Sequence, residues 1–289
     1  MARAAKASAD MGWKIVDLMS PQVNSTHQRS QCELRVEMER GESNMNNNFI
    51  YDETWASNYQ RFARIHGRIA EVDETVTFLE SYSRGGNALE LGIGNGRVAV
   101  PLGERGVRVE GIDNSDSMLE LLVKRTDLVK AWKGDIADFK TEQSYNLVYC
   151  VYNTFQLLAT REAQLTCLRS AAEALDEQGI LVIEFDVPAL EGFVNGQKTT
   201  TVFVDHENTI LNAHVHDPLN QHLISSLLWF SGTSVRRLPY RARYVYPQEL
   251  DTMAERVGLE LVERWGDWAR GAFTEHSKRH ISVYRRISL

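Results

Sequence analysis

Residues 88–102, ALELGIGNGRVAVPL, join a short apolar run that carries one glutamate to three glycines at alternate positions. The run at 87–93 is typical of a buried strand, and the segment 97–106 is typical of a helix that ends at a glycine. The three glycines lie in the turn between these two elements, where they permit a tight backbone and the close approach of a ligand. In a doubly wound sheet, this first strand-to-helix turn usually contacts the cofactor.

Strands and helices continue to alternate after this turn. Further strands are predicted at 107–113, 129–136, 145–153 and 180–188, and helices at 115–126 and 161–179. This alternation predicts an α/β fold with a Rossmann-like, doubly wound and mostly parallel sheet. After Pro188, four short strands with turn residues between them predict an antiparallel insertion, and the parallel pattern is expected to resume with a helix at 247–258 and strands at 259–268 and 278–286.

We therefore divide the chain into five parts. They are an arm-like or flexible N-terminal extension (1–45), a helical cap (46–86), the cofactor-binding core (87–187), the antiparallel insertion over the acceptor site (188–239) and the C-terminal completion of the core (240–289).

Two further acidic residues follow strands in the way a nucleotide site requires. Asp113 ends the second strand, 21 residues after Gly92, where an acidic residue commonly binds ribose hydroxyls. Asp135 follows the third strand and can accept from an adenine amino group, with Ile136 packing on the ring.

The glycine spacing separates two classes of cofactor. A dinucleotide site has the pattern G-x-G-x-x-G, but here the pattern is G-x-G-x-G with Arg97 in the sixth position. Glu90 stands just before the glycines, where it would repel a pyrophosphate but suits a ligand with an ammonium and a sulfonium group. This favours S-adenosyl-L-methionine (SAM) and a methyltransferase. An NAD-dependent oxidoreductase and a non-catalytic SAM-binding protein remain as alternatives.

The stretches ALELGIGNGR, VEGIDNSDSML, GDIADF and GILVIEFD together resemble the successive motifs of the class I SAM-dependent methyltransferases, over residues 46–187 and 240–289. The chain looks most like the small-molecule methyltransferases of bacterial natural-product biosynthesis. The resemblance implies that a helix with Tyr51 and Tyr59 folds over the cofactor, although Gln60 stands where the family commonly has Asp. The cofactor-binding residues expected in all are Tyr51, Tyr59, Glu90, Gly92, Gly94, Gly96, Asp113, Asn114, Met118, Asp135, Ile136 and Tyr149.

The residues that assist methyl transfer are less apparent in the sequence. Histidines and Glu184 are candidate bases, and we take His214, His216 and Tyr59 as the catalytic candidates. The two histidines share one face of a strand, which also occurs in metal sites, but we favour the simpler interpretation that they are polar residues alternating with Val215 on a half-exposed strand. We expect no metal, because the segment 145–156 lacks the carboxylate cluster of Mg-dependent relatives.

The acceptor is expected to be a small hydrophobic metabolite that is methylated on O, N or C. Aromatic residues of the fourth strand and of the insertion could form its pocket, namely Tyr149, Tyr152, Phe155, Trp229 and Phe230. Aromatic faces also stabilise cations, so methylation of an alkene or isoprenoid carbon through a carbocation is the alternative. The sequence VYNTF lacks the prolines found in methyltransferases of nucleic-acid bases.

Composition restricts the possible partners. The formal net charge is −7 over 289 residues and the basic residues are dispersed, so a nucleic-acid partner is not expected. No apolar run has the length of a membrane span, and three widely spaced cysteines fit a reducing compartment. We expect a cytoplasmic protein that does not bind membranes and that forms a homo-oligomer through its arm and insertion.

Overall fold

The computed structural model of this chain describes residues 53, 56, 58, 59, 63, 64 and 69–287. All of them belong to one compact unit that spans residues 47–289. The predicted extension at 1–45 and the candidate Tyr51 lie outside the described residues.

The central element is a sheet of seven strands with the order β10-β11-β5-β4-β1-β2-β3. β1 pairs in parallel with β2 on one side and β4 on the other, so the direction of winding reverses between β1 and β4. Doubly wound folds bind their ligands at the carboxyl ends of the strands beside such a reversal. The bounds are β1 (Asn87–Leu91), β2 (Arg108–Asp113), β3 (Lys130–Lys133), β4 (Tyr145–Cys150), β5 (Leu175–Asp186), β10 (Leu259–Trp265) and β11 (Arg279–Arg286).

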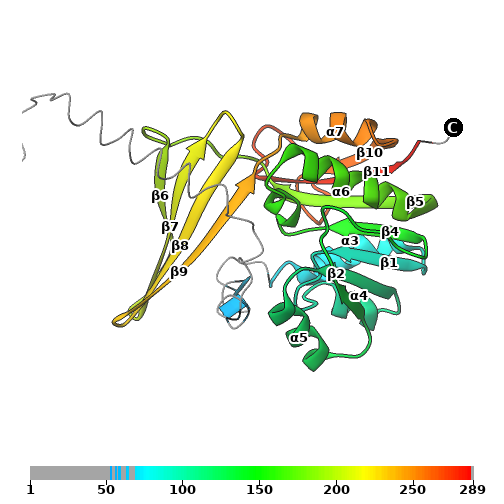
Figure 1. Cartoon of the computed structure of the whole chain (residues 1–289), viewed down its shortest axis with the longest axis horizontal. Helices are drawn as coiled ribbons and strands as arrows, with labels where there is room; N and C mark the ends of the chain where they lie inside the picture. Colours follow the sequence, from blue (N-terminus) through cyan, green and yellow to red (C-terminus); the bar gives the residue numbers. More distant parts are fainter. Residues whose placement is uncertain (1–52, 54–55, 57, 60–62, 65–68, 288–289) are drawn as a thin grey trace, which may run out of the picture. The chain divides into compact units, whose positions relative to one another are not determined.

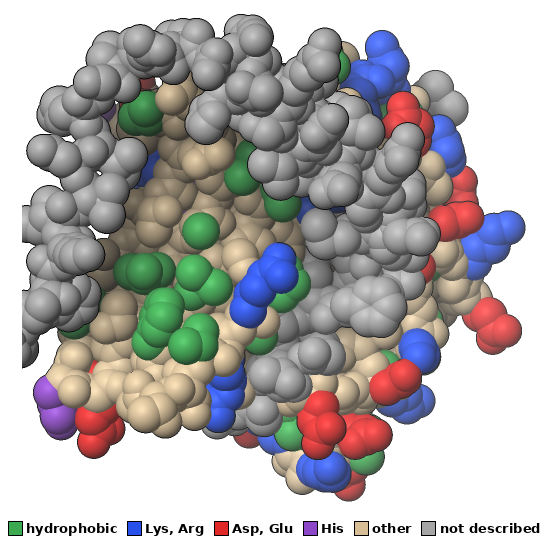
Figure 2. Space-filling view, turned by 60° about the vertical axis from the view of Figure 1, so that its left-hand side comes forward, with side chains coloured by type: hydrophobic (Ala, Val, Ile, Leu, Met, Phe, Trp, Pro, Cys, Tyr) green, Lys and Arg blue, Asp and Glu red, His purple; other side chains and the backbone are tan. Residues whose placement is uncertain are grey.

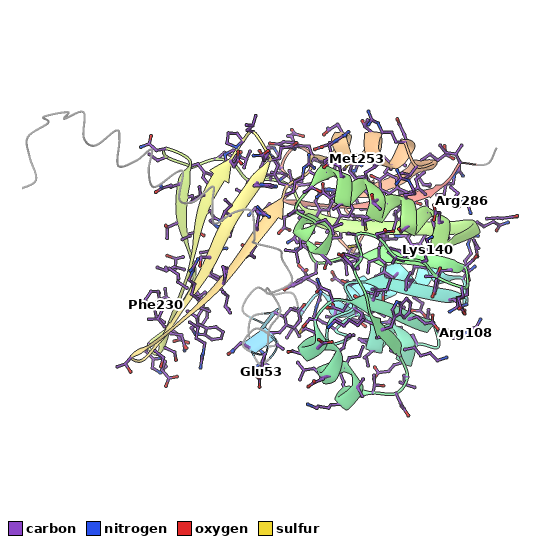
Figure 3. The ribbon with its side chains drawn as sticks, viewed as in Figure 1. Glu53, Arg108, Lys140, Phe230, Met253 and Arg286 are labelled. Carbon is purple, nitrogen blue, oxygen red and sulfur yellow. The ribbon has the colours of Figure 1, made fainter. Side chains whose placement is uncertain are left out.

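Helices cover both faces of this sheet (Figure 1). The helices α3 (Val72–Ser83), α4 (Ala99–Glu104) and α5 (Asp116–Arg125) bury apolar side chains in one hydrophobic cluster. On the other face, α6 (Arg161–Ala174) and α7 (Pro247–Glu255) do the same, and Met253 of α7 (Figure 3) is fully buried there. No helix in the described part of the chain is both long and apolar enough to cross a membrane.

The predicted antiparallel insertion is present as a second sheet of four strands in the order β6-β7-β8-β9. One face of this sheet is buried and carries Ile210, Leu227, Trp229 and Leu238. Hydrophobic side chains also gather on the face that Figure 2 turns forward, and Phe230 near the far tip is partly exposed (Figure 3). The bounds are β6 (Gln197–Val204), β7 (Asn208–Asp217), β8 (His222–Ser231) and β9 (Ser234–Arg243).

The buried side chain of Arg243 attaches the end of β9, and with it the insertion, to the core. Arg243, the last residue of β9, donates to Gln164 of α6 and to Glu249 of α7, each at 2.7 Å. Gln164 in turn donates to the backbone oxygen of Arg243 at 3.1 Å. His222 also lies within hydrogen-bond distance, 2.7 Å, of the backbone oxygen of Ala159. These polar contacts fix the position of the insertion relative to helices α6 and α7.

The structure corrects two details of the predicted fold. α6 ends at Ala174 and β5 already begins at Leu175, because Leu175 pairs with Tyr145 of β4, whereas the helix was expected to reach residue 179. The C-terminal strands do not continue the parallel pattern either. β11 runs antiparallel to both β5 and β10.

Candidate active site

The glycine turn after β1 has the backbone conformation that its sequence predicts. Gly92, Gly94 and Gly96 have φ angles of 78°, 54° and 74°, in the left-handed region that favours glycine. A Cβ atom on Gly92 would lie 2.4 Å from Cγ2 of Thr154, and one on Gly96 would lie 2.4 Å from Cδ1 of Leu122. The turn is therefore packed closely from two sides. A side chain at Gly92 or Gly96 would collide with these neighbours, so the turn keeps this conformation only with glycine at both positions.

Asp113 connects this turn to the end of β2. Its carboxylate accepts from the backbone N–H of Gly94 at 2.8 Å and of Ser115 at 2.9 Å. Burial raises the pKa of Asp113, and the backbone donors, which include Asn114, oppose that rise. A carboxylate offers about four lone-pair sites, so acceptor capacity remains for a ligand hydroxyl.

The other candidates near β2 and β3 surround the same corner of the sheet. The backbone N–H of Gly134 donates to the backbone oxygen of Asp113 at 3.0 Å, which brings the end of β3 beside the end of β2. Asp135 is exposed and accepts from the N–H of Ala137 at 2.8 Å, whereas Ile136 is partly buried. Asn114 is exposed, and Met118 is buried in the first turns of α5.

Glu90 is a carboxyl buried in the strand below the turn. Its Oε2 accepts from the hydroxyl of Tyr149 at 3.0 Å. Burial raises the pKa of Glu90 to about 8, against the opposing effects of the Tyr149 hydrogen bond and of the positive charge of Arg97. The group is therefore poised to ionise when a positive charge comes near.

Tyr59 joins this site from the helical residues before α3. Its ring is buried against Ala56 and Met118, with Tyr152 packed beside them. Burial raises the pKa of Tyr59, while the charge of Arg97 and a hydrogen bond from it act in the opposite direction. Tyr59 thus packs on Met118 of α5, whose Cε would lie 3.0 Å from a Cβ atom on Gly94. The expected contact of Tyr59 with the cofactor stays a prediction.

Arg97 was not predicted as a site residue, whereas Tyr152 was expected in the acceptor pocket and lies against Arg97. The Cζ atom of Arg97 lies 4.1 Å from the centroid of the Tyr152 ring. Tyr152 and Asn153 follow β4 with φ angles of 66° and 62°, and such left-handed non-glycine residues often mark functional positions. The placement of Arg97 directly after the last glycine was the available sequence signal.

The strained turn after β4 is held by acidic residues of β5. The N–H of Tyr152 donates to Glu184, and Asn153 exchanges hydrogen bonds with Asp186 at 2.9 and 2.7 Å. Glu184 is buried and lies 3.9 Å from Arg279. This candidate base therefore supports the backbone of the turn.

The predicted catalytic histidines lie in the four-stranded sheet. Nδ1 of His214 is 2.8 Å from the Ser225 hydroxyl, and Nε2 of His216 is 2.9 Å from the Tyr244 hydroxyl. Burial and the charge of Lys198 lower the pKa of His214, which favours the neutral imidazole. The structure thus divides the candidates into two sets: Tyr59 belongs to the cofactor turn, and the histidines belong to the insertion.

The predicted aromatic wall of the acceptor pocket is wrong in part. Phe155 packs inside the core, with its ring centroid 6.0 Å from that of Phe185. Trp229 and Phe230 are consecutive residues of β8, so they point to opposite faces of the sheet and cannot line one pocket together.

Comparisons with known proteins agree with this site. A family model described as a methyltransferase domain matches residues 88–179. The CcbJ methyltransferase from Streptomyces caelestis is 35% identical, with a TM-score of 0.80 over 84% of this chain and all of that one. The cypemycin N-terminal methyltransferase of a Streptomyces species is 26% identical over 242 residues, which are 82% of this chain and 98% of that protein. A dTDP-4-amino-2,3,4,6-tetradeoxy-D-glucose N,N-dimethyltransferase from Saccharopolyspora spinosa is 26% identical over 153 residues, 51% of this chain and 61% of that protein.

The chain belongs to the class I SAM-dependent methyltransferases, and SAM is its cofactor. The resemblance predicted from the motifs, to methyltransferases of bacterial natural-product biosynthesis, is confirmed, and so is the Rossmann-like fold with its antiparallel insertion. The residues present fit this cofactor. A side chain at Gly92 or Gly96 would collide with its neighbours, so the turn stays bare at these positions. Asp113 retains acceptor capacity, and the buried acid Glu90 stands just before the turn.

Proposed function

We propose that this protein transfers the methyl group of SAM to an amine nitrogen of a small natural product or its precursor, without a metal ion. The observation that carries the proposal is the arrangement of Glu90, the glycine turn and Asp113, in a chain whose similar relatives include an N-terminal methyltransferase and an N,N-dimethyltransferase. The first is named for the N-terminus of cypemycin and the second for a dTDP-linked amino sugar. An amine is the chemical group that these two acceptors share.

The chemistry of the step fits the groups in the site. When bound, SAM supplies a methyl carbon that is already strongly electrophilic. The protein then has to align an amine lone pair behind that carbon and exclude water, and such orientation contributes about 7–11 kcal/mol. In the part of the chain that the structure describes, no three His, Cys, Asp or Glu side chains cluster as metal ligands.

An amine that arrives protonated must lose a proton before it can react. His214 and His216 stay our proposed proton acceptors, because the pKa of His214 is lowered and its imidazole is available in the neutral form. Tyr59 is proposed to close the cofactor side, since its buried ring packs on Met118 beside the turn.

Acceptor profiling with isotopically labelled SAM tests the proposal. The panel contains amino sugar nucleotides, peptides with free N-termini and small amino acids, with matched alcohols and alkenes that lack the amine. We expect mass spectrometry to find label only on nitrogen, in reactions that tolerate EDTA. Label on oxygen or carbon would refute N-methylation, and tight SAM binding without turnover on any acceptor would favour a non-catalytic SAM-binding role.

A further inference from the structure

Arg97 is a charged side chain that stands between the glycine turn and a buried helix. It follows the turn directly and precedes α4, in which Ala99, Val100 and Leu102 are buried. The Arg97 residue is itself partly buried. Desolvation of a guanidinium is costly unless it interacts with other groups, so its position calls for an explanation in terms of what it binds.

Two aromatic residues hold the guanidinium from different sides. The Tyr152 ring lies 4.1 Å below its Cζ atom, and the Tyr59 hydroxyl accepts a hydrogen bond from it. Tyr152 comes from the carboxyl end of β4, while Tyr59 comes from the helical residues before α3. Because the Tyr152 ring and the Tyr59 hydroxyl both hold the guanidinium, its orientation is restricted before any ligand arrives.

The neighbouring charge has the opposite sign. Glu90 and Arg97 interact electrostatically across the turn, and the Tyr149 hydroxyl holds the Glu90 carboxyl from the far side at 3.0 Å. A carboxyl and a guanidinium on the two sides of one backbone turn complement a ligand that carries both a positive and a negative charge, that is, a zwitterion. The amino-acid end of SAM is such a zwitterion, with an ammonium and a carboxylate on one carbon.

We propose that Arg97 binds the α-carboxylate of SAM and that it determines, with Glu90, that the cofactor carries an intact amino-acid end. A planar guanidinium can bind both carboxylate oxygens through two parallel N–H donors, which an ammonium group on a flexible chain cannot do. The inference concerns the cofactor alone and does not depend on the acceptor proposed above.

Binding of two ligands distinguishes this role from a structural one. Isothermal titration is carried out with SAM and with decarboxylated SAM, which keeps the sulfonium and the amine but lacks the carboxylate. We expect Arg97→Gln to weaken SAM binding by about 10- to 100-fold and to leave the affinity for decarboxylated SAM nearly unchanged. Arg97→Lys retains the positive charge but lacks the two parallel N–H donors of the guanidinium. We therefore expect it to lose part of the preference for SAM over decarboxylated SAM.

The matched control is Arg108→Ala. Arg108 is exposed at the start of β2, at the opposite end of the strand from Asp113 (Figure 3), and its removal should change neither affinity. An equal loss of both ligands in Arg97→Gln, or an unchanged affinity for SAM, would overturn the proposal. If Arg97→Gln does not fold, the test uses Arg97→Lys and the natural protein. Each is titrated with SAM and with decarboxylated SAM, and equal affinities of the natural protein for the two ligands would refute the proposal.

Discussion

The carboxylate of Asp113 accepts a hydrogen bond from the backbone N–H of Gly94 at 2.8 Å, across the glycine turn that follows β1. The residue proposed to bind ribose therefore also holds the glycine turn in place. These two roles can be measured separately. Support of the turn affects the stability of the free protein, whereas the ribose contact affects the affinity for the ligand.

Asp113→Ala is expected to lower both the stability of the free protein and its affinity for SAM. Removal of the carboxylate leaves the N–H groups of Gly94 and Ser115 without this acceptor, at about 1–3 kcal/mol each if water cannot reach them. Thermal unfolding without ligand reports the first effect, and calorimetric titration with SAM reports the second. Asp116→Ala, at an exposed position of α5, is the control. An unchanged dissociation constant would contradict the ribose contact.

Glu90 makes the stability of the free protein depend on pH. Its pKa is raised from 4.5 to about 8 in the folded chain, so between these values the folded state retains a proton that the unfolded state has lost. Stability from this group therefore falls as the pH rises from 4.5 to 8. We expect Glu90→Gln, which stays neutral, to be the less pH-sensitive protein in denaturant titrations between these limits. Parallel curves for both proteins would contradict this prediction.

SAM binding should release a proton from the same group. A ligand with an ammonium and a sulfonium favours the ionised carboxyl, so the pKa of Glu90 falls on binding and affinity rises as the pH approaches 8. Calorimetry at pH 7 in buffers of different ionisation enthalpy measures the protons released. Because the amine of SAM also titrates, the relevant quantity is the difference from Glu90→Gln, and identical proton release in the two proteins would exclude Glu90 as the source.

Gly92→Ala is expected to destabilise the protein for two separable reasons. The new Cβ atom would meet Cγ2 of Thr154 at 2.4 Å, and the φ angle of 78° is unfavourable for any side chain, at about 1–2 kcal/mol. Thr154→Ser removes the methyl group but keeps the hydroxyl that donates to the backbone oxygen of Val151. In the double variant we expect thermal unfolding to show recovery of the steric part only. Full recovery would show that backbone strain is negligible here.

His214→Gln tests the proposed proton acceptor. With an amine acceptor we expect kcat to fall by about 100-fold or more, with no change in the affinity for SAM, since general-base catalysis contributes on this scale. The pH profile should lose the ionisation of a group whose pKa is lowered by burial and by Lys198. Ser225→Ala removes the hydroxyl beside Nδ1 and serves as a milder companion variant. An unchanged kcat would assign His214 to the structure of β7 alone.

The fold could be predicted because local pattern and tertiary role agree along most of the chain. The apolar runs that form β1, β4 and β5 are bounded by turn residues, and glycines stand where the backbone needs positive φ angles. Prediction failed where long-range pairing decides the structure. Pairing of Leu175 with Tyr145 ended α6 early, and only the sheet topology shows that β11 runs antiparallel to β5.

The local geometry of the candidate site agrees with the sequence only for residues whose place in the motif is fixed, namely Glu90, Asp113 and the glycines. Their contacts with the cofactor stay a prediction. Arg97 and Tyr152 approach one another across two loops that are 55 residues apart, and no periodicity in either loop indicates their contact. Phe155 and Trp229 were predicted from residue type alone, and burial placed both in hydrophobic clusters.

The attachment of the four-stranded sheet through Arg243 has a mechanical consequence. The same guanidinium donates to Gln164 of α6 and to Glu249 of α7, so loss of that one group would release the end of β9 from both helices at once.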